Sequence, residues 1–371
     1  MEKHRSEKEE CVMVLQRCVK KLHFGSWGEK EVAAKVIERL AEQDGKVRGL
    51  IIELGVVPVL VSMAVSDMDS RRRLGLKALI HIANGNYWNK ALIVEAGILS
   101  KLPKKIVIED ESTSDYADLL ASLSSIANTQ FPQASLHLIQ FLIDILKTCS
   151  SFDTKQSCLV ALSNISAVLQ NAGPLISNGV VPILLELSLM REVSEKALTT
   201  LGNLVVTLIG KKAIENSSMV PQCMIETLSW EDKPKCQELS AYILMILAHH
   251  SSSQRNKMVQ ARIVPTLLEV ALLGSPLVQK RAMRILQWFK DESRQIKLGP
   301  HSGPQTPTTA KRSLENQGDT KEGKRLIKNL VKESLRRNLE IITKRANVAV
   351  DSSKLKSLFI STSSKSLLAK I

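Results

Sequence analysis

The sequence predicts an all-α protein whose short helices repeat and stack into a right-handed superhelix. Two observations lead to this prediction. A glycine-led apolar phrase returns at intervals of about 40 residues, and a second phrase of small and apolar residues follows it by about twenty residues. Such a period is typical of solenoids with two or three helices in each repeat. We therefore expect stacked helical repeats rather than a closed globular core.

The first phrase is clearest at residues 55–60, Gly-Val-Val-Pro-Val-Leu, and at residues 179–184, Gly-Val-Val-Pro-Ile-Leu. Weaker copies put the leading position at Gly97, Ser218 and Arg262, so the steps are 42, 82, 39 and 44 residues. The step of 82 is two steps of 41, which predicts a degenerate copy near residues 135–142. Because glycine can end a helix in a left-handed conformation and proline suits the first turn of the next, each copy predicts a sharp corner.

The second phrase, at residues 75–82, 158–165 and 197–204, predicts the third helix of each repeat. Its small residues would let neighbouring helices approach closely, and its apolar residues recur at helical spacing and would fill the interior. The small positions are Gly75, Cys158 and Ala197, and the apolar positions are Leu79, Leu162, Leu201, Ile82, Ile165 and Leu204.

Together these phrases resemble the armadillo family, in which a short first helix precedes a Gly-x-x-Pro-x-Leu helix and an Ala-Leu-x-Asn-Leu helix. The resemblance covers residues 26–297 and implies a solenoid of about six or seven repeats. Residues 30–41, followed by Arg48 and residues 50–55, are most similar to the armadillo regions of plant U-box proteins. The sequence has no Cys-Pro-Ile-containing U-box signature, so we do not carry ligase activity over from that resemblance.

We expect four segments along the chain. Residues 1–25 predict an N-terminal cap, residues 26–297 the solenoid, residues 298–322 a flexible linker, and residues 323–371 a basic amphipathic helix and tail. In the first segment, residues 12–22 read as an amphipathic helix that covers the first repeat or, alternatively, recruits a partner. Its apolar positions are Val12, Leu15, Val19 and Leu22, and we expect Phe24 and Trp27 to seal its junction with the repeats.

The repeats depart most from their common sequence pattern between residues 109 and 146. Residues 119–128 predict a third helix and residues 137–146 the next second helix. The acidic run Glu109-Asp110-Glu111, with Ser112 to Ser114 after it, predicts a solvated loop or, alternatively, a phosphorylation target.

Composition favours a soluble protein of a reducing compartment. Hydrophobic residues make up 44% of the 371, yet no run approaches the roughly 18 apolar residues of a membrane span. No apolar signal core follows the charged first ten residues, and the six cysteines form no Cys-x-x-Cys pair. We expect free thiols and a cytoplasmic or nuclear location.

The apparent chemical motifs of the sequence lack the residue spacing that their chemistry requires. Residues 202–211 lack the glycine spacing and Ser/Thr of a phosphate loop, and His249-His250 lack the spacing of zinc ligands. We therefore expect a noncatalytic protein with no cofactor, no metal site and no small-molecule substrate.

Stacked third helices should instead offer a wall of exposed positions that recur once per repeat. Aligning the repeats gives two candidate rows that bind proteins or extended peptides. The first row is His81, Ser125, Asn164, Asn203, Ile246 and Trp288, and the second row, one helical turn earlier, is Lys77, Ala121, Val160, Thr199, Tyr242 and Arg284. Asn164 and Asn203 have two open interpretations: each amide anchors a ligand backbone, or each bonds the neighbouring repeat.

The chain also resembles nuclear-import receptors, but it departs from their pattern of a tryptophan four residues before each asparagine. Val160 and Thr199 hold those positions here, so we do not expect a general receptor for nuclear localisation signals. Tyr242, Ile246, Trp288 and Phe289 make the last third more apolar, which predicts either packing or a place for a hydrophobic anchor.

The tail carries most of the formal net charge of +14: residues 311–371 hold 15 Lys and Arg against 6 Asp and Glu. Leucines at near-helical spacing predict a basic amphipathic helix, which could dock as a cap, stay solvated, bind an anionic membrane or nucleic acid, or serve as an import signal. Its candidate residues are Lys324, Arg325, Lys328, Lys332, Arg336, Arg337, Lys344 and Arg345.

The predicted function is therefore a protein-interaction scaffold or adaptor. Two alternatives stay open: a substrate-recruiting component of the ubiquitin pathway that needs a separate ligase, and a membrane or nucleic-acid tether that works through the tail.

Overall fold

The computed structural model describes residues 2–43, 45–103, 111–127 and 136–295. Over these ranges the secondary structure is α-helix with short 3-10 helices and no strand, which confirms the all-α prediction. The chain divides into two compact units, Met1–Thr227 and Leu228–Ile371, and each unit is described by itself.

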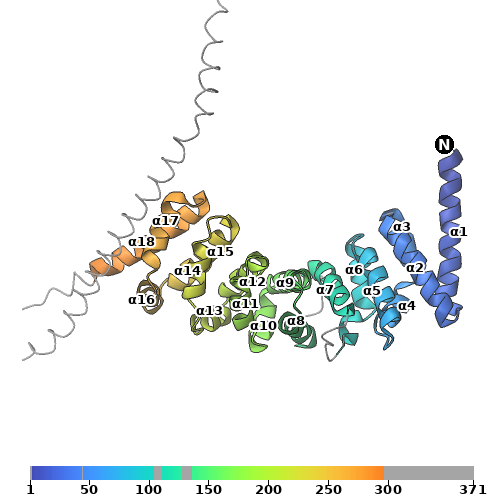
Figure 1. Cartoon of the computed structure of the whole chain (residues 1–371), viewed down its shortest axis with the longest axis horizontal. Helices are drawn as coiled ribbons and strands as arrows, with labels where there is room; N and C mark the ends of the chain where they lie inside the picture. The colour runs from blue at the N-terminus through green and yellow to red at the C-terminus, as the bar shows by residue number, and fades with distance from the viewer. Residues whose placement is uncertain (1, 44, 104–110, 128–135, 296–371) are drawn as a thin grey trace, which may run out of the picture. The chain divides into compact units, whose positions relative to one another are not determined.

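The helices keep the numbers of Figure 1. Those of the first unit are α1 (Glu2–Phe24), α2 (Trp27–Gln43), α3 (Gly45–Glu53), α4 (Val57–Ala64), α5 (Asp69–Ala83), α6 (Tyr87–Glu95), η1 (Ile98–Lys101), α7 (Ser112–Leu123), η2 (Ser124–Ile126), α8 (Leu136–Thr148), α9 (Phe152–Ser166), η3 (Leu169–Asn171), α10 (Ala172–Ser177), α11 (Val180–Ser188), α12 (Ser194–Val205) and α13 (Leu208–Glu215). After α14 (Gln222–Leu228), which ends at the boundary, the second unit has α15 (Pro234–Ala248), α16 (Ser252–Gln260), α17 (Ile263–Leu273) and α18 (Pro276–Gln295).

The predicted corners occur before the second helices. Gly55, Gly97 and Gly179 have φ of 70°, 84° and 71°, and Arg262 has φ of 60°. L-residues pay about 1–2 kcal/mol for this left-handed conformation, so Arg262 is strained where glycine would not be. The corner near Ser218 differs from the prediction: Ser218 is not left-handed, and this turn contains a cis Val220–Pro221 peptide.

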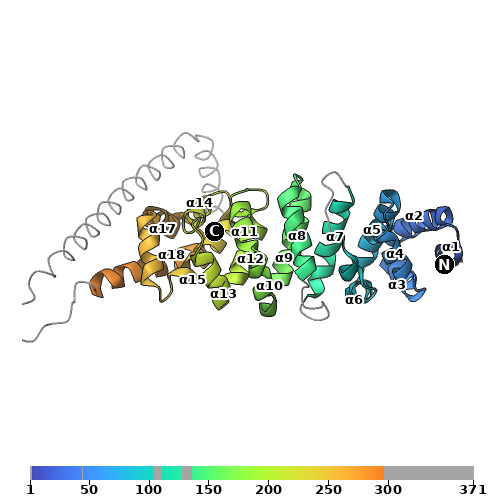
Figure 2. The same cartoon turned by 90° about the horizontal axis from the view of Figure 1, so that it is seen from below.

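Third helices form the interior of each unit. In the first unit α5 packs on α2 and α7, and α9 packs on α7 and α12; in the second unit α15 packs on α18. Figures 1 and 2 both show α5, α7, α9 and α12 following one another in chain order. The apolar positions predicted from the second phrase are fully buried, as are Cys158 and Ala197.

Polar bonds join consecutive repeats, and their sequence separations match the repeat period. In the first unit Arg71 pairs with Glu31, 40 residues away, and the Ser157 hydroxyl donates to Asp118, 39 residues away. In the second unit Ser275 donates to Glu238 across 37 residues. Charged and hydroxyl side chains therefore hold neighbouring repeats in register around the apolar interior.

A second set of bonds closes the ends of the third helices. The buried Asn89 amide donates to Ile82 O at 3.0 Å, the buried Asn171 amide to Ile165 O at 3.0 Å, and the Arg255 guanidinium to Ala248 O at 2.8 Å. Carbonyls at a helix C-terminus have no partner inside the helix. After α5, α9 and α15, the segment that follows the helix supplies a partner for such a carbonyl.

The N-terminal segment differs from its prediction in two respects. Helix α1 extends over Glu2–Phe24; from residue 12 onward, where side chains are described, its buried residues are Leu15, Cys18 and Leu22, whereas Val12 is exposed. Phe24 is 86% exposed and does not seal the junction, so that expectation was wrong. Trp27 instead lies under the Arg71 guanidinium, 3.9 Å from the ring centroid, which links α2 to α5.

The loop predicted for residues 109–114 is shorter than expected. Helix α7 begins at Ser112, whose side chain is buried and accepts from Arg72 Nε at 2.9 Å. Glu111 pairs with Arg73 of α5. The third helix ends at Leu123 and continues as η2, while Glu109, Asp110 and Asn128 lie outside the described residues.

In the described part of the chain, no single helix is long and apolar enough to cross a membrane. Two bent pairs meet the length and composition test together, Gly45–Glu53 with Val57–Ala64 at 94° and Phe152–Ser166 with Leu169–Ser177 at 111°. Both pairs contribute buried residues to the repeats. The predicted linker, residues 298–322, and all the basic tail residues lie outside the described ranges.

The approach of α4 to α5 depends on Gly75. A methyl group added there would lie 2.5 Å from Ala64 N and 2.9 Å from Leu60 O. We expect Gly75→Ala to lower the free energy of unfolding by about 1–3 kcal/mol because the two backbones must separate. Urea melts followed by circular dichroism would measure this loss.

The matched control is Gly49→Ala in α3, where nothing lies within 4 Å of the added methyl. Alanine favours a helix over glycine by about 1 kcal/mol, so this variant should be neutral or more stable. Identical melts for the two variants would show that the α4–α5 approach imposes no constraint.

Candidate functional site

Every member of the two predicted rows keeps some contact with solvent. In the first unit Lys77 and His81 lie on α5, Ala121 and Ser125 on α7 and η2, and the remaining pairs on α9 and α12. Adjacent positions on the same helices are fully buried. The rows therefore mark the surface of the third helices that packing leaves accessible within the unit.

Both asparagines bond the preceding repeat. Asn164 Nδ2 donates to Ser124 Oγ at 3.0 Å, and Asn203 Nδ2 donates to Ser163 O at 3.1 Å and Ser166 Oγ at 3.0 Å. These bonds favour the second interpretation, in which the amides connect repeats. An amide carries an acceptor oxygen as well as donors, so an inter-repeat role and ligand contact are compatible.

Charged side chains lie beside the row residues of the first unit. Burial raises the pKa of Asp115, and the charges of Lys77 and Arg73 act in the opposite direction. Lys90 donates to the first-row hydroxyl of Ser125 at 2.7 Å, and burial lowers the pKa of Lys90. The wall of this unit is therefore polar and of mixed charge.

In the second unit, members of both rows meet in a pocket between α15 and α18. Its volume is about 400 Å³. Ile246, Arg284 and Trp288 were predicted and lie together here, whereas Tyr242 lies beside the pocket under the Arg281 guanidinium, 5.0 Å from the ring centroid. Phe289, which was grouped with them, is a core residue. The remaining lining residues are Met245, His249, Leu277, Lys280 and Arg281.

Aligning the repeats with one another did not identify those five lining residues, although the sequence holds a signal for three of them, Leu277, Lys280 and Arg281. Leu277, Arg281, Arg284 and Trp288 follow one another at steps of four, three and four, which places them on one face of a helix. Extending the second row one more turn back would have found Arg281 and Lys280. His249 was considered only as a metal ligand, and it instead faces Trp288 with ring centroids 5.4 Å apart.

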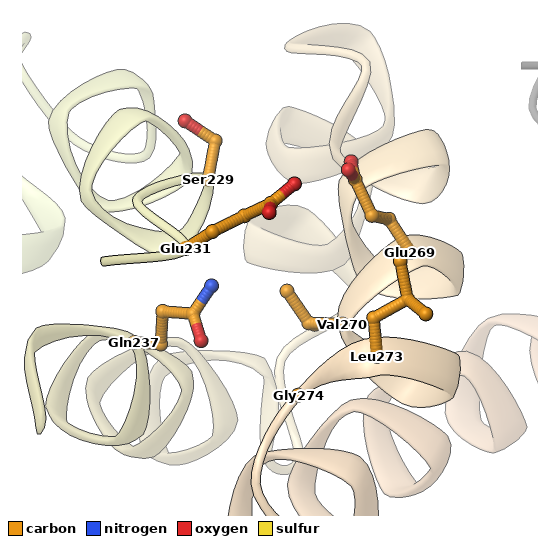
Figure 3. Close-up of a pocket in the computed structure, with 7 residues that line it drawn as sticks. All are labelled: Ser229, Glu231, Gln237, Glu269, Val270, Leu273 and Gly274. Carbon is orange, nitrogen blue, oxygen red and sulfur yellow. The ribbon is translucent and has the colours of Figure 1, made fainter. Parts of the chain in front are cut away.

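A smaller pocket of about 240 Å³ in the same unit has the opposite charge. It is lined by Gln237 of α15 and by residues of α17 and the α14–α15 turn. Figure 3 shows Glu231 of the turn and Glu269 of α17 reaching toward each other there. The unit therefore presents one acidic and one basic pocket.

The described residues contain no group of three or more His, Cys, Asp or Glu side chains arranged to hold a metal ion. Cys18, Cys149, Cys158, Cys223 and Cys236 carry free thiols. Burial raises the pKa of Cys223 to about 12, and burial also raises the pKa of Cys158, so these two thiols are poor nucleophiles.

Helix triplets that recur about every 40 residues, with left-handed corners before the second helix, define an armadillo-repeat solenoid. The relatives of this chain are plant U-box proteins, as the resemblance implied. U-box domain-containing protein 45 of Arabidopsis thaliana is 25% identical over 293 residues, which cover 76% of this chain and 38% of that protein. U-box domain-containing protein 7 of the same plant is 26% identical over 201 residues, 51% of this chain and 26% of that protein.

The chain thus spans less than half the length of these two relatives. No protein-family model matches it. Among solved structures, an engineered protein from the Northeast Structural Genomics Consortium matches with a TM-score of 0.63 and 22% identity, covering 84% of this chain and 77% of that one.

The Asn203 bonds predict a stability effect that does not need a ligand. We expect Asn203→Ala to lower the free energy of unfolding by about 1–3 kcal/mol, because two partly buried hydrogen bonds to α9 are lost. Thr199→Ala on the same helix is the control, since the Thr199 hydroxyl bonds only Glu195 O of its own helix at 2.7 Å. Its effect should stay within about 0.5 kcal/mol. Unchanged melting of Asn203→Ala would favour ligand anchoring instead.

Proposed function

We propose that this protein is a noncatalytic scaffold or adaptor that binds other proteins along the two rows of its third helices, in the cytosol or nucleus. The observation that most supports this is the solvent contact of every row member beside fully buried neighbours on the same helices. Positions that recur once per repeat on rigid stacked helices provide an extended binding surface.

The chemistry of the first unit suits an extended segment of a partner. His81 on α5, Ser125 on η2 and Thr199 on α12 are polar side chains in contact with solvent. The Ser125 and Thr199 hydroxyls donate to Ser122 O and Glu195 O, so each keeps acceptor capacity for a partner. Backbone groups of an extended peptide need such partners when they leave water. Because the frame is held by inter-repeat bonds, binding would not have to order it.

The relatives support a second candidate within the same class. Their names identify them as U-box proteins, so this chain could recruit substrates in the ubiquitin pathway together with a separate ligase. The tether proposed for residues 323–371 stays a prediction from charge alone, because those residues lie outside the described ranges.

Site-specific photo-cross-linking in cells tests the role of the rows. A photoreactive amino acid at Val160 or Thr199 should give a small set of discrete adducts, whereas the same group at Glu186, exposed on α11, should give few. Val160→Arg should then reduce the adducts formed at Thr199, since both positions would contact one segment. Ubiquitin ligases among the adducts would favour the adaptor candidate.

The control position decides the outcome. Equal adducts at Glu186, or adducts at Thr199 that are insensitive to Val160→Arg, would contradict binding along the rows.

A further inference from the structure

The pocket between α15 and α18 combines apolar side chains with several cations. Met245, Ile246, Leu277 and Trp288 supply the apolar lining, and every fully charged side chain in the lining is basic: Lys280, Arg281 and Arg284. Lys280 and Arg284 are exposed, and the volume of about 400 Å³ is within the usual range of ligand pockets.

The carboxylates nearest in sequence have partners outside the pocket lining. Glu238 accepts from Ser275 at 2.8 Å and pairs with Lys235, Asp291 accepts from Gln287 Nε2 at 2.8 Å, and Glu292 pairs with Arg255 at 2.7 Å. Burial acts to raise the pKa of Glu292, but hydrogen bonds from Arg255 and Ser252 outweigh it and lower that pKa. Arg281 donates to a neutral acceptor, Glu238 O, at 2.7 Å. The positive potential of the pocket is therefore not cancelled by its own lining.

We propose that this pocket binds an acidic peptide segment of a partner protein through one large apolar side chain. This rests on the proposed protein-binding role and names the chemistry of the partner for the second unit. The apolar side chain would pack against Ile246, Leu277 and Trp288, and carboxylates on either side of it would face Lys280 and Arg284. Complementary charge selects the partner and speeds association, while burial of the apolar group supplies affinity.

Other occupants fit the pocket less well. The basic tail, with 15 Lys and Arg against 6 Asp and Glu in residues 311–371, carries the same sign of charge as the pocket. A nucleobase would pack on the same Trp288 ring as the proposed apolar side chain, so an oligonucleotide is tested beside the peptide.

Fluorescence anisotropy with the full chain tests the proposal. The probe is a short labelled peptide of aspartate and glutamate with one central phenylalanine. We expect saturable binding that weakens as salt rises and falls at least about tenfold in Arg284→Glu, because a cation facing the peptide becomes an anion. Lys290→Glu is the matched control: it makes the same charge change at an exposed position of the same helix outside the pocket. It should change affinity less than about twofold.

Two further probes separate charge from the apolar anchor. The peptide with serine in place of phenylalanine should bind at least about tenfold more weakly, since burying a large side chain contributes about 1.5–3 kcal/mol. Ile246→Ser should weaken the phenylalanine peptide and leave the serine peptide unaffected. Circular dichroism melts confirm that each variant is folded.

Several results would overturn the proposal. Equal losses of peptide affinity in Arg284→Glu and Lys290→Glu, or equal affinity of the two peptides, would show that the peptide binds diffuse positive charge, such as that of the tail. Tighter binding of a single-stranded oligonucleotide that Arg284→Glu abolishes would assign the pocket to nucleic acid. Cross-links at Val160 without peptide binding would leave the scaffold role intact and refute only this inference; the reverse would support the pocket and refute the rows of the first unit.

Discussion

Within each unit, the structure depends on the packing of each third helix against the neighbouring third helix. The apolar positions supply the free energy, because full burial of a Leu or Ile contributes about 1.5–3 kcal/mol. Burial alone does not fix how far one helix slides along the next. Directional bonds do, and Asn203 to Ser163, Ser157 to Asp118 and Ser275 to Glu238 each span about one repeat. These bonds also determine which side chains stay exposed, and so which can bind.

The same frame presents different chemistry in the two units. In the first unit the rows are largely polar, with Ser125, Asn164 and Thr199, and their electrostatics are mixed. In the second unit the row positions bear Ile246, Arg284 and Trp288 and meet in a basic apolar pocket. Because repeats tolerate substitution at exposed positions while the buried ones are constrained, one solenoid can carry distinct recognition sites.

Sequence periodicity was enough to predict the core and every left-handed corner except the one expected near Ser218, because both follow from local residue types. Even Arg262, without a glycine, was placed correctly at a left-handed corner by the phrase that follows it. Hydrogen bonds between repeats were not predictable. The sequence does not indicate whether the Asn203 amide bonds Ser163 of the preceding repeat or a ligand. Phe24 was misplaced because an apolar residue beside a helix end gives no sign of whether a partner lies over it. The basic pocket depends on the packing of α15 against α18, which the sequence does not show. The helical spacing from Leu277 to Trp288 indicated only the α18 side of the pocket.

Native-state hydrogen exchange along a urea series tests the central claim, that stability passes between neighbouring third helices. We expect the amides of α7 and α9, which have repeats on both sides, to exchange with the highest opening free energy. Helices α1 and α18 should open earlier and at lower urea, since each has a packed third-helix neighbour in its unit on one side only. One opening free energy shared by every helix from α1 to α18 would contradict the account and indicate a single closed core.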